Sequence, residues 1–289
     1  MKAEQAKKMA DEALANLATA LEQGQSDAMK TFLAAVGRFH RYSFGNIMLI
    51  ASQKPDATRV AGFQTWKSLG RFVKKGEKGI VIIAPMVLRR KDASDHADAS
   101  DEDRTILRFR AVYVFDVSQT DGEPLPEPAS MSGDPAGHID RLKAFIASRG
   151  ITLEYLTDLD ATVQLGHADG ASYGGKIALR ADLSPAESFS VLVHELAHEM
   201  LHQTDKEHRP SKTVRETEAE SVAFAVSQAI GLETTTAASD YIQLYAGDKE
   251  TLAASLDRIQ HAATAIIEAL TEKQDAKADS EEDLESLAA

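Results

Sequence analysis

The segment His194-Glu195-Leu196-Ala197-His198 constrains what this chain can be more than any other part of its 289 residues. Upstream of it, Ser184-Pro185-Ala186-Glu187 has the pattern of a helix start, with a capping Ser, a Pro in the first turn and a Glu three residues after the cap. Histidines four residues apart on a helix project from the same face. This spacing predicts that His194 and His198 are ligands of one zinc ion.

Glu195 lies between the two histidines in the sequence, and we expect it to be the catalytic base. A glutamate at this position can take a proton from a zinc-activated water without binding the metal, and can pass it to the leaving amine. The alternative is a helix that carries histidines by accident. That alternative is disfavoured because unpartnered histidines are costly in a core helix. The neighbouring residues are those of a core helix: Val191, Leu192, Val193, Leu196, Ala197, Met200 and Leu201.

A third ligand is expected on the next helix, because zinc hydrolases generally use three protein ligands and keep one position open. Glu216 and Glu220 share a helix face, and we assign Glu216 as the ligand and Glu220 as the carboxylate that orients a ligating imidazole. Three alternatives stay open: the two roles could be exchanged, the glutamates could simply favour the helix dipole, or His208 could be the ligand. Glu218 is expected to point elsewhere, and His202 would strain a tetrahedral site.

Helices and strands are expected in separate blocks, so we predict the α+β class with two domains. The predicted helices cover residues 4–22, 27–41, 45–52, 137–148, 184–203, 212–230 and 248–272. The predicted strands cover residues 79–84 and 106–115, which should pair, and 151–155, 162–165 and 176–179. A run rich in Gly and Pro from residue 120 to 136 marks the boundary between the domains. The predicted organisation is a first domain over 1–125, a linker over 126–136, a second domain over 137–273 and a disordered acidic tail over 274–289.

Charge is divided unevenly along the chain, whose formal net charge is −13. Residues 1–90 contain 15 Lys and Arg against 7 Asp and Glu, a net charge of +8, and the remainder contains 17 against 38, a net charge of −21. A basic block in an acidic chain indicates nucleic-acid contact by that block, although two ordinary solvated faces are the competing explanation. The chain has no cysteine, no signal-peptide pattern and no apolar run long enough for a membrane helix. We therefore expect a soluble, cytoplasmic protein with no membrane partner.

Residues 172–225 carry a resemblance to a known group of enzymes. They include Ser172-Tyr173-Gly174-Gly175-Lys176-Ile177-Ala178-Leu179, the helix around His194, and the stretch 215–225. This region resembles the ImmA/IrrE-type metallopeptidases, which implies a zincin-like fold for the second domain. The resemblance also implies a glutamate as third ligand, which corresponds to Glu216, and a short strand that pairs with the substrate backbone, which suits Lys176–Leu179.

Three segments of the first half carry a second resemblance: Tyr42–Ile50, Ala61–Arg71 and Val73–Ile80. They resemble the single-stranded-DNA-binding domain of ArdC-type antirestriction proteins, and the order of the two domains is also that of ArdC. The resemblance implies that residues 1–125 bind single-stranded DNA.

Cations alternate with aromatic residues in this first half, a composition that can follow phosphates and stack bases without sequence preference. The expected DNA contacts are Arg38, Arg41, Tyr42, Asn46, Trp66, Lys67, Arg71, Lys74, Lys75 and Lys78. For any single ring, and above all for Trp66, burial in the core is the competing interpretation. The prediction therefore depends on the lysines and arginines more than on the rings.

These observations together predict a single-stranded-DNA-binding zinc metallopeptidase of the mobile-element antirestriction type, with Zn²⁺ as cofactor. Its partners would be single-stranded DNA and a protein substrate that the sequence does not identify. Two alternatives remain: a non-catalytic DNA-binding antirestriction protein with a structural zinc, and a protease of DNA–protein crosslinks. Glu195 argues against the first, because a structural site needs no base, and His208 as a ligand would indicate the second.

Overall fold

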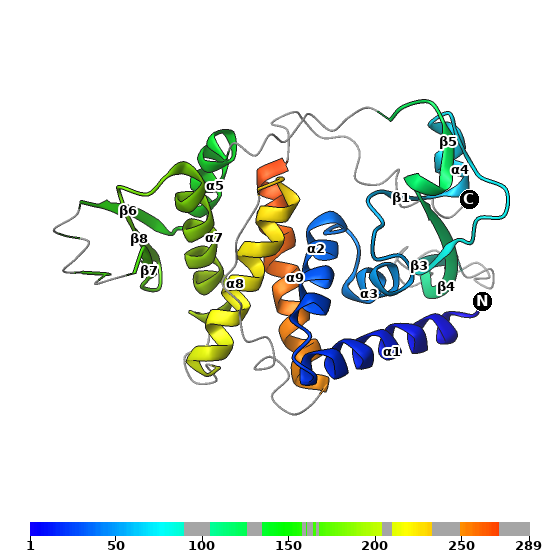
Figure 1. Cartoon of the computed structure of the whole chain (residues 1–289), viewed down its shortest axis with the longest axis horizontal. Helices are drawn as coiled ribbons and strands as arrows, with labels where there is room; N and C mark the ends of the chain where they lie inside the picture. Colours follow the sequence, from blue (N-terminus) through cyan, green and yellow to red (C-terminus); the bar gives the residue numbers. More distant parts are fainter. Residues whose placement is uncertain are drawn as a thin grey trace, which may run out of the picture. The chain divides into compact units, whose positions relative to one another are not determined.

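The computed structural model describes residues 1–89, 105–125, 135–157, 160, 164–165, 168–203, 210–232 and 249–271. Helices and small sheets both occur, so the predicted α+β class is confirmed (Figure 1). By their contacts, the described residues of Met1–Ala13 and Met48–Leu125 form one compact unit, and Leu14–Ile47 with the described residues between Pro126 and Asp275 form another. The predicted tail (274–289), residues 126–134 of the predicted linker and His208 lie outside the described residues.

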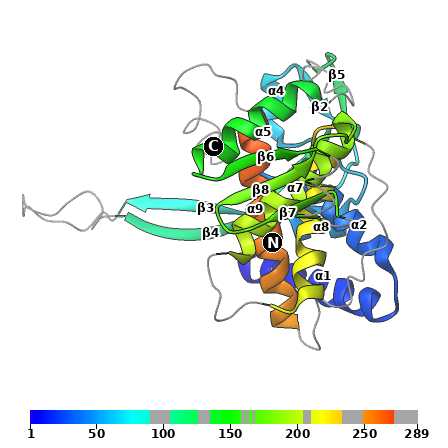
Figure 2. The same cartoon turned by 90° about the vertical axis from the view of Figure 1, so that its left-hand side faces the viewer.

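The first unit contains a long antiparallel hairpin, formed by β3 (Ile80–Arg89) and β4 (Thr105–Asp116), as predicted (Figure 2). A short strand, β1 (Val60–Gly62), pairs with the other side of β4. Val81 from this hairpin packs with Leu49 and Ala6 in a buried cluster. These two residues come from α3 (Phe44–Gln53) and α1 (Ala3–Glu22), two helices whose other ends belong to the second unit.

A second sheet of two strands pairs β2 (Arg71–Val73) with β5 (Thr120–Gly122). The helix α4 (Phe63–Ser68) precedes β2 directly. β5 occupies the start of the Gly/Pro-rich run that the sequence assigned to the domain boundary. Thr120 is buried there, so the ordered first unit extends into that run.

The second unit is mainly helical. Its helices are α2 (Ser26–Arg38), α5 (Ala136–Ser148), α7 (Pro185–His202), α8 (Lys212–Ala229) and α9 (Lys249–Thr271). Its sheet consists of β6 (Thr152–Leu156), β8 (Lys176–Arg180) and β7 (Gly170–Ser172), in that order across the sheet. The sheet lies on one side of α7, and α8 lies on the other side (Figure 1).

β8 is the central strand of this sheet, because it pairs in parallel with β6 and in antiparallel with β7. The expectation that Lys176–Leu179 pairs with a substrate is therefore wrong, since both of its edges are already used. The edge strand next to α7 is β7, which the sequence did not predict. Of the strand predicted over 162–165, Gln164 and Leu165 are helical, and the other two residues lie outside the described part of the chain.

The second unit also includes α2, which the sequence places in the first domain. Met29, Phe32, Leu33 and Val36 form its buried face, which packs on α8 and α9. Gly37 allows a close approach to α8, because a Cβ atom there would lie 2.5 Å from the carbonyl oxygen of Ala225. None of the helices in the described part of the chain is both long and apolar enough to cross a membrane.

Candidate functional site

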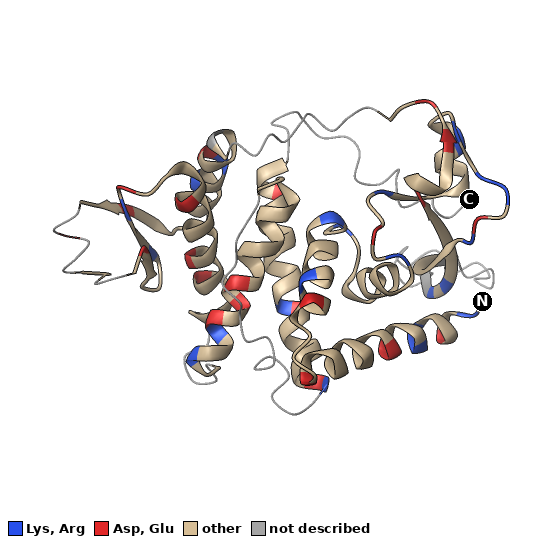
Figure 3. Ribbon diagram, viewed as in Figure 1, with Lys and Arg blue, Asp and Glu red and all other residues tan. Residues whose placement is uncertain are grey.

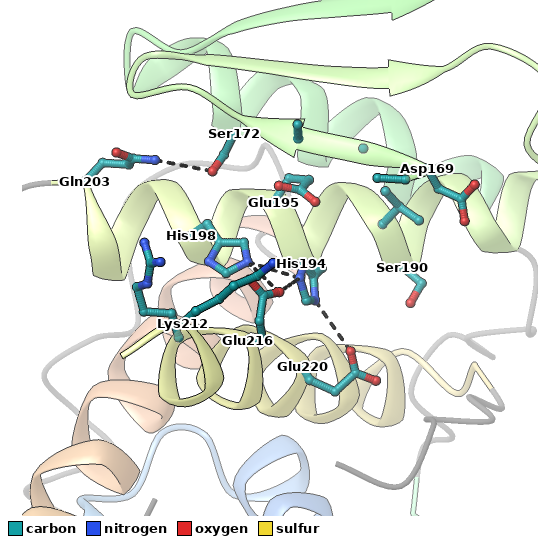
Figure 4. A pocket seen from close by; sticks show the side chains of 15 residues that line it. Asp169, Ser172, Ser190, His194, Glu195, His198, Gln203, Lys212, Glu216 and Glu220 are labelled. Atoms are coloured by element: carbon teal, nitrogen blue, oxygen red, sulfur yellow. Dashed lines mark hydrogen bonds and ion pairs between the residues drawn. The ribbon is translucent and has the colours of Figure 1, made fainter. Parts of the chain in front are cut away.

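Helix α7 begins where the sequence predicts it. The Ser184 hydroxyl accepts a hydrogen bond from the Glu187 backbone N–H, and the Glu187 side chain accepts one from the Ser184 N–H. The apolar residues of α7 are buried, among them Phe189, Leu192 and Leu196. This burial fixes the rotation of the helix, so that His194 and His198 face α8 (Figure 4).

Three side chains from α7 and α8 bring potential metal-binding atoms together: His194, His198 and Glu216. Nε2 of His194 lies 3.1 Å from Nε2 of His198. Glu216 Oε2 lies 3.5 Å from the first of these nitrogens and 3.4 Å from the second. Ligands of a tetrahedral zinc ion, bound at about 2.1 Å each, are separated by about 3.4 Å. The three side chains therefore fit a zinc ion without rearrangement.

The charges of this cluster are strongly coupled. Burial is the largest influence on His194 and opposes its protonation, but the Glu216 and Glu220 carboxylates together outweigh it and raise its pKa to about 9. The hydrogen bond from His194 lowers the pKa of Glu216 to about 2. Burial, followed by repulsion from His194, lowers the pKa of His198 to about 4. The carboxylates thus hold one positive charge where a cation would bind.

Glu220 lies on the other side of His194, with its Oε2 atom 3.5 Å from the Nδ1 atom of that ring. This nitrogen is the one that does not face His198 and Glu216. A carboxylate in that position can orient the ring and favour the tautomer that leaves Nε2 free for a metal. The role of Glu220 as the carboxylate that orients this imidazole stays a prediction.

Glu195 faces away from α8 and toward β7 (Figure 4). Burial raises its pKa to about 7, although the positive charge of His194 and a hydrogen bond from the Ser172 backbone lower it. A carboxyl group with this pKa can both accept and release a proton near neutral pH. Glu195, the metal-binding cluster and β7 line one cavity of about 540 Å³.

Two residues that sequence reasoning missed hold β7 against α7. Gly170 has no side chain where the strand meets the helix, and a Cβ atom there would lie 2.7 Å from Val191 Cγ1. Glu199 accepts hydrogen bonds from the backbone N–H groups of Gly174 and Gly175, at 2.8 and 2.7 Å, in the turn between β7 and β8. The sequence spacing gave no signal for the roles of Gly170 and Glu199, because both roles depend on where β7 and the turn after it lie relative to α7.

The predicted DNA contacts fall in both units. Arg38, Arg41, Tyr42 and Asn46 belong to the second unit, and Trp66, Lys67, Arg71, Lys74, Lys75 and Lys78 belong to the first. Arg38 lies over the ring of Phe39, and Tyr42 packs edge-on against the same ring. Asn46 is buried, and Arg41 is exposed.

Trp66 requires a correction, because only 2% of it is exposed. Its indole N–H donates a hydrogen bond to the Phe115 carbonyl oxygen at 2.8 Å, so the ring is a core residue and offers no face for stacking. Arg71 is also used internally. Its guanidinium donates to the Thr120 side chain and to carbonyl oxygens of β5 and Glu123, which ties β2 to β5.

Exposed cations and rings do occur together in the first unit. Lys67 lies on α4, Lys74, Lys75 and Lys78 follow β2, and all four are exposed. Figure 3 shows Lys and Arg in blue along this part of the first unit. Phe63 on α4 is 52% exposed, and Phe72 on β2 is 57% exposed. The two elements α4 and β2 contact each other. The described part of this unit holds 13 Lys and Arg against 8 Asp and Glu, a net charge of +5.

Comparison with known proteins identifies both halves of the chain. Residues 3–115 match the N-terminal domain of anti-restriction factor ArdC, and residues 149–254 match a peptidase family described as the IrrE N-terminal-like domain. An uncharacterized protein from Bacillus anthracis is 26% identical over 279 residues. The match covers 82% of this chain and 47% of that protein, so the chain spans about half of the relative's length.

Two crystal structures of the antirestriction protein ArdC from the R388 plasmid share the fold, each with a TM-score of 0.51. The metal-free form is 18% identical and covers 91% of this chain and 97% of its own. The Mn(II)-bound form is 17% identical and covers 92% of this chain and 99% of its own. This chain therefore joins a segment that matches the ArdC N-terminal domain to a segment that matches the IrrE N-terminal-like domain, and it shares the fold of ArdC from the R388 plasmid.

Proposed function

We propose that this protein is a zinc metallopeptidase of the mobile-element antirestriction type that also binds single-stranded DNA. The observation that carries the peptidase proposal is the single cavity that contains the metal-binding cluster, Glu195 and the edge strand β7. A structural zinc site is normally closed by four protein ligands, whereas the described residues offer three here and the cluster opens into a cavity. The cavity supports a catalytic site rather than a structural one.

Zn²⁺ is the proposed ion, held by His194, His198 and Glu216. Two imidazoles and one carboxylate form a donor set typical of zinc hydrolases. The Mn(II)-bound form of the R388 protein supports a divalent metal in this fold, although at 17% identity it does not identify the ion here. Zinc supplies Lewis-acid chemistry, in which a nearby water becomes acidic and the scissile carbonyl becomes polarised.

The protein's own residues supply the proton transfer and the alignment. Glu195, with a pKa near 7, accepts a proton from the attacking water and passes it to the amine of the leaving peptide. Among the described residues, no strand pairs with the outer edge of β7, where the Ser172 backbone N–H donates to Glu195. An extended peptide can add to the remaining backbone groups of this edge through hydrogen bonds. Such a peptide would lie across the face of α7 that carries Glu195. The proposed substrate is therefore a peptide segment in extended conformation.

Single-stranded DNA is the proposed second ligand, and the first unit is the proposed site. The exposed lysines after β2 can contact phosphates, and the exposed rings of Phe63 and Phe72 can stack on bases. The net positive charge of the described part of this unit supports the proposal, because phosphate binding releases counterions. The match of residues 3–115 to the ArdC N-terminal domain points to DNA as the partner.

The test uses the full-length protein and its Glu195→Gln variant. Metal content is measured by elemental analysis, and hydrolysis of an unfolded protein such as casein is followed with and without single-stranded DNA. We expect about one zinc per chain in both proteins and hydrolysis by the unmodified protein only. Zinc without hydrolysis under both conditions would favour the non-catalytic alternative, and absence of bound metal would contradict the proposal altogether.

A further inference from the structure

A buried series of hydrogen bonds continues from His198 away from the metal-binding cluster. Nδ1 of His198 lies 3.0 Å from Nδ1 of His202, one turn further along α7. Nε2 of His202 lies 2.9 Å from Oε2 of Glu218 on α8. The other oxygen of Glu218 pairs with the guanidinium of Arg258 on α9. The series thus connects three helices of the second unit.

The two middle members of this series are buried, and the Arg258 side chain at its end is 41% exposed. The side chain of His202 is 1% exposed, and that of Glu218 is 0% exposed. A buried carboxylate is costly unless it is paired and hydrogen-bonded, and Glu218 has partners on both oxygens. The guanidinium of Arg258 places a positive charge beside one oxygen, and His202 lies at hydrogen-bond distance from the other. Glu218 is therefore a fixed hydrogen-bond acceptor for His202.

This fixed acceptor determines the tautomers of both histidines. Because an ionised carboxylate can only accept, His202 must carry a proton on Nε2, and its Nδ1 is then an acceptor in the neutral ring. His198 can donate to that acceptor only from Nδ1, which leaves its Nε2 unprotonated. Nε2 is the atom that lies near His194 and Glu216. The series therefore presents the lone pair of His198 to the metal-binding cluster.

We infer that His202, held by Glu218 and Arg258, is a positioning residue that fixes the ring and tautomer of His198 for metal binding. The inference rests on the proposed metal site. It also gives the two histidine ligands different supports. Among the described residues, the partner of His194 Nδ1 is Glu220, at 3.5 Å and with a side chain that is 27% exposed. The buried support of His198 is the shorter one, so its loss should weaken metal binding more.

The experiment measures zinc affinity of the full-length protein by competition with a chromophoric chelator, together with the melting temperature of the metal-free form. His202→Leu keeps the volume apolar and removes the acceptor, so zinc affinity should fall about 10- to 100-fold. Glu218→Gln should cause a smaller fall, because the amide still accepts but no longer carries the charge. His202→Gln should recover affinity, since its carbonyl can accept from His198 and its amide can donate to Glu218.

Phe189→Leu is the matched control, because Phe189 is a buried residue of the same helix outside the hydrogen-bonded series. It should lower the melting temperature without changing zinc affinity. If His202→Leu lowers only the melting temperature, as this control does, the residue is merely structural and the inference is wrong. If His202→Leu does not fold, unchanged zinc affinity in Glu218→Gln would overturn the inference by itself. Failure of the unmodified protein to bind zinc would instead overturn the proposed function.

Discussion

Gly170 of the edge strand β7 lies directly against Glu195 of α7, so closely that a Cβ atom on Gly170 would come within 3.0 Å of Glu195 Cγ. β7, the strand to which the substrate is proposed to add, is therefore in contact with Glu195, the proposed base. Gly170→Val should displace one from the other. Because a misplacement of about 1 Å can cost about 100-fold in rate, we expect a fall of that order in kcat/KM with zinc content unchanged.

Gly137→Val is the control for this substitution, because a Cβ atom at Gly137 meets nothing within 4 Å. It should leave activity unchanged. Full activity in Gly170→Val would show that the substrate does not depend on the position of β7.

Glu195→Gln should retain zinc and lose activity, because the amide cannot accept the proton and is not a ligand. We expect kcat to fall by at least about 100-fold, the usual contribution of a general base. Glu187→Gln provides the comparison, since Glu187 is a helix-capping residue of α7 that touches no atom of the cluster. Comparable activity in the two variants would exclude Glu195 as the base.

Variants of Glu216 and Glu220 should differ in their zinc affinity. Glu216→Gln removes a proposed ligand and should weaken zinc binding more than Glu220→Gln, which removes only the carboxylate behind His194. For the latter, the usual loss is about 10- to 100-fold. The reverse order would mean that the two roles assigned from the sequence must be exchanged.

Metal affinity should rise with pH. The pKa of His194 is about 9 in the metal-free protein, so its ring is protonated at neutral pH and must lose that proton when it becomes a ligand. Affinity should therefore increase as the pH approaches 9 and level off above it. Calorimetry in buffers of different ionisation enthalpy should detect release of about one proton per metal ion at neutral pH. Binding without proton release would contradict the charge assigned to His194.

Single-stranded DNA binding should depend on the lysines after β2. The variant in which Lys74, Lys75 and Lys78 are all replaced by Ala should bind single-stranded DNA more weakly. The slope of log affinity against log salt concentration should be smaller by about 2, because each of the three lost phosphate contacts contributes about 0.7. The same change at Lys30, Lys143 and Lys249 in the second unit should leave the slope unchanged. Equal slopes in the two triple variants would remove the lysines after β2 from the DNA site.

The aromatic contribution is tested in the same binding assay. Phe72→Ala should weaken binding by about 1 to 3 kcal/mol for a stacked base and leave the melting temperature nearly unchanged. Trp66→Ala should lower the melting temperature without removing a stacked base, because Trp66 is a core residue.

The sequence predicted those parts of the site that lie within one helix. His194, Glu195 and His198 are fixed by helical geometry once the capping residues around Ser184 place α7. Glu216 and Glu220 could be assigned to one face for the same reason. His202 shares the face of His198 on α7, but the sequence offered no means of recognising that its partner is Glu218 on α8.

The parts that failed depend on tertiary contacts. β7 has only three residues, and no periodicity distinguishes so short a strand from a loop. Trp66 could not be assigned to core or surface from its neighbours, because its burial depends on the carbonyl of Phe115, far along the chain. The same holds for α2, whose apolar face is evident in the sequence but whose partner is not.

The close approach of Gly37 to Ala225 has a consequence for biosynthesis. α2, which belongs to the second unit, leaves the ribosome early and must wait for α8 and α9, which follow more than half a chain later. Contacts between segments so far apart in the sequence slow folding. The same topology affects limited proteolysis. A nick between residues 125 and 135 should yield two pieces that copurify, because α2 on the first piece stays seated on α8 and α9 of the second.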